Sequence, residues 1–155
     1  MGKVVSINIS KAKGTAKKSV SKIELVPGLG VMGDAHAGPG ERQVSLLMSE
    51  SIEEARNLTG ADKGCEIAEP GIELGPGSFA ENITTKDIDL LSLTPGQELV
   101  VGESIRLRVT RIGKECHRPC AIYYKLGGCI MPGKGIFCEV LQGGVVRPGD
   151  RIEKR

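Results

Sequence analysis

The chain has 155 residues and a mass of 16.4 kDa, which fits one domain and argues against a two-domain enzyme with separate cofactor and substrate lobes. Its 21 Lys and Arg against 19 Asp and Glu give a net charge of only +2, and it has two Phe, two Tyr and no Trp. A nonspecific nucleic-acid binder needs more basic and aromatic surface than this. We therefore expect a single domain over residues 1–155 that binds no nucleic acid.

Glycine and proline, with 22 and 8 residues, separate short apolar runs, which predicts short strands joined by tight turns. No apolar stretch reaches the length of a membrane helix, and residues 1–10 lack the apolar region of a secretory signal. We expect a cytoplasmic protein without membrane contacts. A solvated loop is expected for the most basic stretch, which contains Lys11, Lys13, Lys17 and Lys18.

The first part of the chain predicts two strands and a polar loop. Residues 3–10 (KVVSINIS) and 22–26 (KIELV) are rich in β-branched residues and bracketed by turn residues. The Lys/Gly-rich segment between them predicts a hairpin connection. Residues 27–40 contain too many Gly and Pro for regular structure, so we expect a loop that presents Asp34 and His36.

A buried strand and one helix are predicted next. Residues 43–48 (QVSLLM) read as the strand, and Ser49 then offers an N-cap before acidic residues that complement a helix dipole. We expect this helix to carry Ile52 on its apolar face and to end at Gly60. Residues 71–85 are turn-rich and strand-like.

The remainder is β in character. Apolar runs predict strands at 99–101 and 135–141, and the alternation of apolar and polar residues predicts one at 105–112, with a hairpin turn at 101–104. The sequences LTPGQELVV and VVRPGDRIE each contain a Pro-Gly turn that leads into a short strand. Together these elements predict a mainly β fold, a β-barrel with one to three short helices.

The chain has five cysteines, an odd number without an export signal, so we treat them as thiols and not as a disulfide framework. Four fall in the C-terminal third: Cys116, Cys120, Cys129 and Cys138. The last two stand among apolar residues and are expected in the core, as free Cys often is.

Cys116 and Cys120 have a different setting. Lys114 and Arg118 are close in sequence, and cationic neighbours favour the thiolate, the form that attacks sulfur or binds a soft metal. Cys120 follows Arg118-Pro119 in a rigid polar turn, where a β scaffold displays reactive groups. We therefore expect Cys120 to be the reactive cysteine.

Zinc binding is an alternative for the same segment. Four residues offer soft ligands, namely Cys116, His117, Cys120 and Cys129. Structural zinc sites normally use paired short knuckles, and the C-x3-C-x8-C spacing differs from that pattern.

These residues carry a resemblance to the MOSC domain family, the module at the C-terminus of molybdenum cofactor sulfurases and in small standalone bacterial proteins. The matching pieces are GDAHAG with the following RQVSLL, then GSFAENITT, HRPC and GGVVRPGDRIE, in the family's order between Gly33 and Glu153. The passage GKECHRPCAIYYKLGGCIMPGKGIF is similar to a standalone bacterial subgroup that is often associated with molybdenum cofactor biosynthesis genes.

The resemblance implies a β-barrel and one key cysteine, which maps onto Cys120. In sulfurase-type members that cysteine carries sulfur as a persulfide and passes it to the cofactor, and Cys116 would then resolve or stabilise the persulfide. In the reductase branch the matching cysteine binds molybdenum, and the substrates are N-hydroxylated compounds. A third hypothesis is a zinc-stabilised binding module. The sulfur carrier is our leading expectation.

The cofactor implied by the resemblance is molybdopterin, bound at least transiently. Its phosphate and oxo groups need cations and donors, which His36, Arg42 and Arg118 would supply, and Asn82 suits the pterin ring edge. Two alternatives stay open, that Asn82 braces a turn and that Asp34 caps its loop.

The implied partners follow from what the chain lacks. It has no pyridoxal-phosphate domain, so a separate cysteine desulfurase with that cofactor would load the sulfur. Molybdenum cofactor biosynthesis proteins or acceptor enzymes would receive the product.

Overall fold

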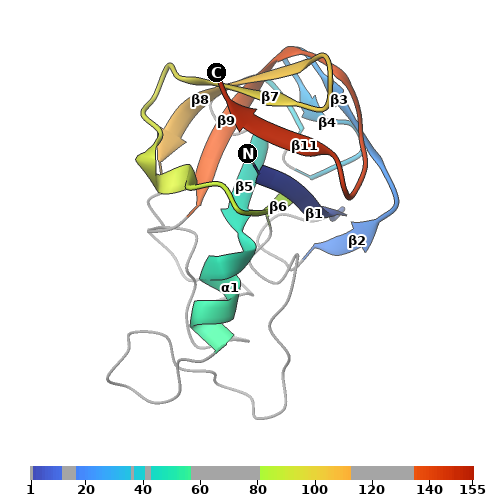
Figure 1. Ribbon diagram of the computed structural model, residues 1–155. Helices are drawn as coiled ribbons and strands as arrows, with labels where there is room; N and C mark the ends of the chain where they lie inside the picture. The colour runs from blue at the N-terminus through green and yellow to red at the C-terminus, as the bar shows by residue number, and fades with distance from the viewer. Residues whose placement is uncertain (1, 12–16, 36, 41–42, 57–80, 113–134) are drawn as a thin grey trace, which may run out of the picture.

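The computed structural model describes residues 2–11, 17–35, 37–40, 43–56, 81–112 and 135–155. Within these ranges strands dominate, beside one α-helix and one short 3-10 helix (Figure 1). The elements are β1 (Gly2–Ile9), β2 (Lys18–Val20), β3 (Ile23–Val26), β4 (Gly30–Val31), β5 (Val44–Met48), α1 (Ser49–Arg56), β6 (Ile83–Lys86), η2 (Leu90–Ser92), β7 (Glu98–Val101), β8 (Ile105–Ile112), β9 (Ile136–Gln142), β10 (Gly144–Val146) and β11 (Arg151–Lys154).

Seven of these strands close into a barrel. Their hydrogen-bonded order is β11-β7-β8-β9-β5-β6-β1, and β1 pairs in turn with β11 through Gly2 and Ile152. The neighbours are antiparallel except β5 and β6, which run parallel. Figure 1 shows the first and last strands together near both chain ends. The predicted mainly β barrel with few helices is confirmed.

Alternation of side chains along the strands builds the barrel core. In β8 the buried Ile105, Leu107 and Val109 alternate with Arg106 and Arg108, as predicted for a strand with one wet face. Other strands contribute core residues in the same way, among them Val4, Ile7, Val44, Leu46, Ile83, Leu99, Val101, Ile136, Cys138 and Ile152.

Three short strands differ from the sequence expectation. The hairpin partner of β1 is β2, with Ile7 opposite Val20, and not the strand at 22–26. That strand, β3, instead lies between β10 and β4 in a separate three-stranded sheet. Residues 27–40, expected to lack regular structure, contain β4. Two- and three-residue strands depend on backbone pairing with distant partners, so local composition does not reveal them.

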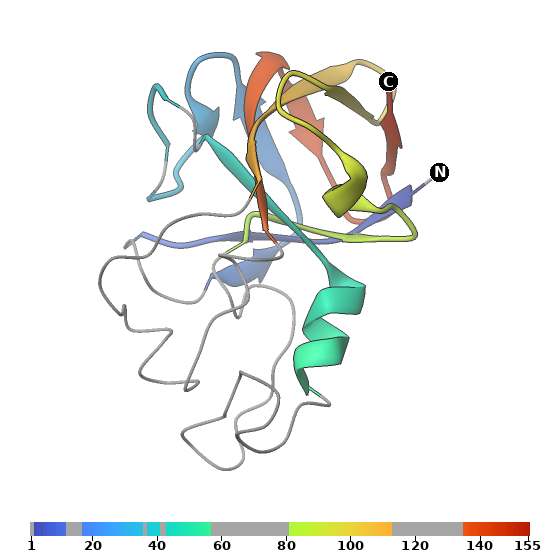
Figure 2. The ribbon, with the colours of Figure 1, turned by 90° about the vertical axis from the view of Figure 1, so that its left-hand side faces the viewer.

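The predicted helix is present as α1, with Ser49, expected as its N-cap, as the first helical residue, and its apolar residue Ile52 is buried. Its predicted end at Gly60 lies outside the described residues. Figures 1 and 2 both show α1 extending away from the barrel at the end of β5. In the described ranges, no helix is long and apolar enough to cross a membrane.

Candidate functional site

The strand register places the ends of two motif-bearing segments in one row of the barrel. Ile112, the last residue of β8, pairs with Ile136 of β9. Ile136 pairs with Leu46 of β5, and Leu46 pairs with Ile83, the first residue of β6. Neighbouring strands are about 4.8 Å apart, so Ile112 and Ile83 are separated by three spacings, about 14 Å. Ile112, the last described residue before the HRPC motif, therefore lies about 14 Å from the start of β6 along this row.

Asn82 stands directly before β6, and its side chain is buried and hydrogen-bonded on both sides. Its Oδ1 accepts from the backbone N–H of Ser45 at 3.1 Å and from the Ser45 hydroxyl at 3.2 Å. Its Nδ2 donates to the carbonyl of Asn8 at 3.2 Å. Asn82 thus joins β5 to β1. These contacts match the alternative in which Asn82 has a bracing role, here between two strands.

Asn8 is a second amide hub next to Asn82. Its Oδ1 accepts from the hydroxyls of Ser6 at 2.8 Å and Ser19 at 2.9 Å. Its Nδ2 donates to the carbonyl of Glu81 at 3.1 Å and to the Thr84 hydroxyl at 3.2 Å. This amide therefore uses two acceptor and two donor positions, which is its full capacity.

These residues form a polar layer on the outer side of the barrel wall. Ser45 lies between the core residues Val44 and Leu46, so strand alternation turns it away from the barrel interior. The outer polar layer, as we name it, consists of residues that are all less than 9% exposed: Ser6, Asn8, Ser45, Glu81, Asn82 and Thr84. Its contacts connect the start of β6, which lies within GSFAENITT, to both neighbouring strands.

Within the outer polar layer, the sequence predicts a site role only for Asn82. The available signal was a polar residue within an apolar strand, as Ser45 in VSLLM and Asn8 in SINIS. Such positions usually face solvent, so the pattern by itself predicts a wet face where the structure has a buried one.

A buried ion pair lies beside this layer. Lys17 Nζ is 2.7 Å from Asp34 Oδ1, and both side chains are 0% exposed. The same ammonium donates to the Ser10 hydroxyl at 3.1 Å. The expectation that the lysine stretch forms a solvated loop is therefore wrong for Lys17, because its ammonium is buried in an ion pair with the Asp34 carboxylate. Lys11 and Lys18 are exposed as expected, but Lys18 belongs to strand β2 and not to a loop.

Most of the predicted site lies outside the described residues. This applies to five residues: His36, Arg42, Cys116, Arg118 and Cys120. Their predicted roles stay predictions. So does a contact of Asn82 with a pterin ring, for which both Oδ1 acceptor positions are taken by Ser45 while Nδ2 uses one of its two hydrogens in the bond to Asn8. The zinc alternative rests on the same undescribed segment, and among the described residues no group of three or more His, Cys, Asp or Glu is placed to hold a metal ion.

Cys138 is fully buried in β9 and belongs to the barrel core, as predicted. Burial raises the pKa of its thiol far above the usual range, with a smaller contribution from the charge of Glu139. Since the thiolate is the nucleophile, Cys138 is inert at neutral pH. Cys138 is therefore not a candidate for the predicted reactive cysteine.

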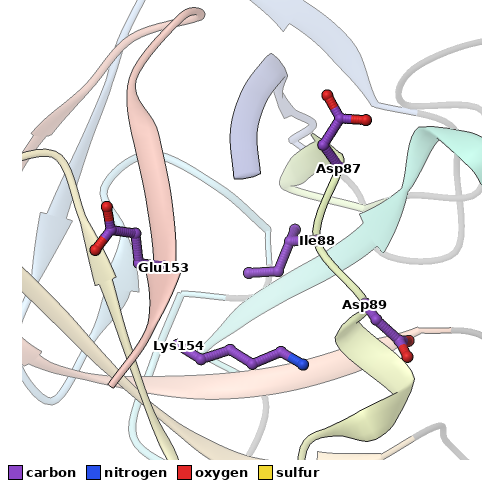
Figure 3. Close-up of a pocket in the computed structure, with 5 residues that line it drawn as sticks. All are labelled: Asp87, Ile88, Asp89, Glu153 and Lys154. Carbon is purple, nitrogen blue, oxygen red and sulfur yellow. The ribbon is translucent and has the colours of Figure 1, made fainter. Parts of the chain in front are cut away.

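The described surface also has a depression of about 490 Å³ lined by Asp87, Ile88, Asp89, Glu153 and Lys154. Figure 3 shows the Asp87 and Glu153 carboxylates pointing away from each other and the Lys154 amine directed towards the segment with Asp89. The Lys154 amine donates to the Ser92 hydroxyl. These groups do not converge on a common point, so this depression has no arrangement for catalysis.

Comparisons with known proteins agree with the barrel. The family model described as MOSC domain matches residues 33–153. Among curated proteins, none matches the chain. YuaD from Bacillus subtilis has a similar solved structure, with 22% identity and a TM-score of 0.73 over 98% of this chain and 94% of that chain.

Two YiiM structures are also similar. The Geobacillus stearothermophilus protein shares 20% identity with a TM-score of 0.70 over 100% of this chain and 75% of that chain. The Escherichia coli protein shares 18% identity with a TM-score of 0.67 over 100% of this chain and 70% of that chain. At such identities the structures establish a common fold, whereas the family match covers all of the motif pieces found in the sequence.

Proposed function

The chain belongs to the MOSC domain family, a family associated with molybdenum cofactor, and from this membership we propose that it is a sulfur carrier for that cofactor. In this proposal Cys120 accepts sulfur from a cysteine desulfurase and delivers it to molybdenum cofactor, which is the substrate. The supporting observation is the row across β8, β9, β5 and β6. The segment with Cys120 follows Ile112 in this row, about 14 Å from Ile83, which starts β6 and belongs to the GSFAENITT motif.

Loading of Cys120 is a displacement at sulfur. The Cys120 thiolate attacks the terminal sulfur of a persulfide on the desulfurase, the donor S–S bond breaks, and the donor cysteine leaves as a thiolate. Cys120 then holds a persulfide, and no external oxidant or reductant is consumed. Lys114, His117 and Arg118 are near in sequence, and cationic neighbours favour the attacking thiolate.

Release of the carried atom as sulfide requires two electrons, and Cys116 is our candidate for supplying them. Its thiolate attacks the Cys120 sulfur, a Cys116–Cys120 disulfide forms, and the terminal sulfur leaves as hydrosulfide. A dithiol reductant then returns the pair to two thiols. Two cysteines four residues apart suit this exchange.

The residues proposed for recognition match the chemistry of the cofactor. Molybdopterin carries a phosphate, and Arg42 and Arg118 are cations that bind such oxygens in a bidentate manner, with His36 as a further donor. Asn82 offers the ring edge its second Nδ2 hydrogen as a donor, and its Oδ1 as an acceptor at the expense of a bond from Ser45. The donor set therefore fits an anionic pterin substrate.

Metal and sulfur analysis of the purified protein distinguishes this proposal from its alternatives. A sulfur carrier contains no stoichiometric metal, and after incubation with a desulfurase and cysteine it releases sulfur as thiocyanate when treated with cyanide. Stoichiometric molybdenum with pterin fluorescence after oxidation would instead indicate the reductase with Cys120 as molybdenum ligand. Stoichiometric zinc would indicate the binding module.

Cysteine variants then locate the carrier atom. Cys120→Ser should lose cyanide-releasable sulfur, whereas Cys116→Ser should load normally but fail to release sulfide, because only the second step uses Cys116. The double variant retains buried Cys138 as an internal control and should load nothing. Loading that persists in Cys120→Ser and disappears in Cys116→Ser would refute the assignment.

A further inference from the structure

The ion pair between Lys17 and Asp34 is unusual because it is completely enclosed. Both side chains are 0% exposed, with Nζ 2.7 Å from Oδ1. Enclosing two charges is unfavourable, and apolar residues of similar volume often stabilise a fold as well or better. A gain in stability is therefore a poor explanation for this buried ion pair, and its geometry suggests a different role.

The pair joins three segments that are separate in sequence. Lys17 directly precedes β2, Ser10 directly follows β1, and Asp34 lies in the loop after β4. Besides the ammonium, Asp34 Oδ1 accepts the Ser10 backbone N–H at 3.0 Å. The Ser10 carbonyl in turn accepts the backbone N–H of Ala35 at 2.8 Å. The loop is thus attached to the end of β1 by side chain and backbone together.

This attachment fixes the chain on both sides of His36. Ala35 is held by Ser10 as described, and the backbone N–H of Ala37 donates to the Asp34 carbonyl at 3.1 Å. The Gly38 N–H donates to the Leu29 carbonyl at 2.7 Å. The two neighbours of His36 are therefore both restrained, and the restraint centres on Asp34.

We propose that Lys17 is a positioning residue for cofactor recognition: its ammonium holds Asp34, and Asp34 restrains Ala35 and Ala37, the two neighbours of His36. This inference rests on the proposed function, because it assigns Lys17 to the same substrate site. It also explains why the carboxylate of GDAHAG is enclosed and neutralised by Lys17, an arrangement that a residue binding the substrate directly would not need. The pair belongs to neither the barrel ring nor the apolar core, so the barrel has the contacts to fold without it.

The test compares Lys17→Met with Lys18→Met, a matched control that removes the exposed lysine next to it, and with Lys17→Arg as the conservative variant. The first readout is the dissociation constant for isolated molybdenum cofactor, measured by pterin fluorescence. The second is the NMR signal of the His36 imidazole, which is readily assigned because the chain has two histidines. The second readout requires no cofactor.

We expect Lys17→Met to shift or broaden the His36 signal and to weaken cofactor binding about tenfold or more, with unchanged stoichiometry. Lys18→Met should match the wild type, and Lys17→Arg should recover most of the affinity. If Lys17→Met does not fold, Asp34→Asn replaces it, since its amide oxygen still accepts from Ser10 while the charge is lost.

The positioning role is refuted if the folded variant, Lys17→Met or its replacement, gives the His36 signal and the affinity of Lys18→Met. Failure of the proposed function looks different. In that case the wild type itself binds no molybdenum cofactor, and the His36 signal alone decides whether Lys17 positions the loop.

Discussion

Thr85 on β6 is a buried hydroxyl in an apolar environment. It is 0% exposed, it lies opposite Val4 and Met48, and its hydroxyl has no hydrogen-bond partner among the described residues. A buried group in this state costs about 1 to 3 kcal/mol relative to a satisfied one. Its neighbour Thr84 is the reverse case, because its hydroxyl donates to Glu81 Oε2 at 2.8 Å and accepts from Asn8.

Thr85→Val should therefore raise the free energy of unfolding by about 1 kcal/mol, since valine has the same shape without the unsatisfied hydroxyl. Urea denaturation measures the change. Thr84→Val is the matched control and should lower stability, because it leaves groups of the outer polar layer without partners. Destabilisation by Thr85→Val would contradict the description of this site.

Glu98 on β7 is a partly exposed carboxylate that contacts two arginines. Its Oε1 accepts from Arg106 Nε at 3.0 Å and lies 3.6 Å from Arg155 Nη1. The hydrogen bond from Arg106 is the main cause of a lowered pKa for this carboxyl, with the charges of Arg106 and Arg155 adding to it. A lowered pKa in the folded state means that the ionised form stabilises the fold, and that this contribution disappears as pH falls.

Glu98→Gln should accordingly be less stable than wild type at pH 7. The difference should shrink as pH falls through the ordinary glutamate pKa of about 4.3 and continue to shrink below it. Thermal unfolding over this pH range checks the prediction. Glu103→Gln, in the exposed turn between β7 and β8, serves as the control, and a pH-independent difference for Glu98→Gln would contradict it.

At the scale of elements, the two Pro-Gly turns are structurally equivalent. In Thr94–Gln97 and Arg147–Asp150 the fourth N–H donates to the first carbonyl, at 3.0 and 3.2 Å. The third residues, Gly96 and Gly149, have φ of 97° and 95°. The first N–H donates to the side chain of the fourth residue in both, at 3.0 and 2.9 Å. The similar sequences LTPGQELVV and VVRPGDRIE therefore form the same type of turn.

Each turn also docks on a strand at a β-bulge. Gly96 N–H donates to Val109 of β8 at 2.7 Å, and Gly149 N–H donates to Val4 of β1 at 2.6 Å. The register shifts directly after both valines. An extra residue in a strand sharpens its bend, so the two turns and their bulges help the sheet to curve into a barrel.

Gly149→Ala should lower the free energy of unfolding by about 1 to 2 kcal/mol, because a side chain is strained at this positive φ. Gly149→Asn should cost less, since asparagine tolerates the left-handed region. Urea denaturation of both variants, with the same pair at Gly96, provides the comparison. Equal losses for alanine and asparagine would show that φ is not the cause.

Local patterns predict some of these elements and not others. The alternation in residues 105–112 and the apolar runs at β5 and β9 are long enough to identify strands, and the Pro-Gly turns follow from residue type. The pairing partners of the strands do not follow from local patterns. For example, β2 pairs with β1, where the sequence predicts residues 22–26. The parallel pairing of β5 with β6 likewise depends on contacts between residues that are far apart in sequence.

At the scale of the whole molecule, the barrel closes where Gly2 and Lys3 pair with Ile152 and Arg151. No local signal predicts this contact between the two ends of the chain, and the barrel expectation rested on strand content and on the family resemblance. The same holds for the site. Cys120, His36 and Arg42 come from motifs, whereas the Lys17–Asp34 pair and the outer polar layer become visible only when distant segments meet.

The central claim is that one sulfur atom, on Cys120, carries sulfur for molybdenum cofactor. Its most direct test is to incubate the Cys116→Ser variant, which loads but does not release sulfur, with a cysteine desulfurase and radiolabelled cysteine, digest it without reductant and locate the label by peptide mass mapping. The account predicts one added sulfur atom on the peptide with Cys120 and none on the peptide with Cys138. Label on another cysteine alone, or no label beside an active desulfurase, would contradict it.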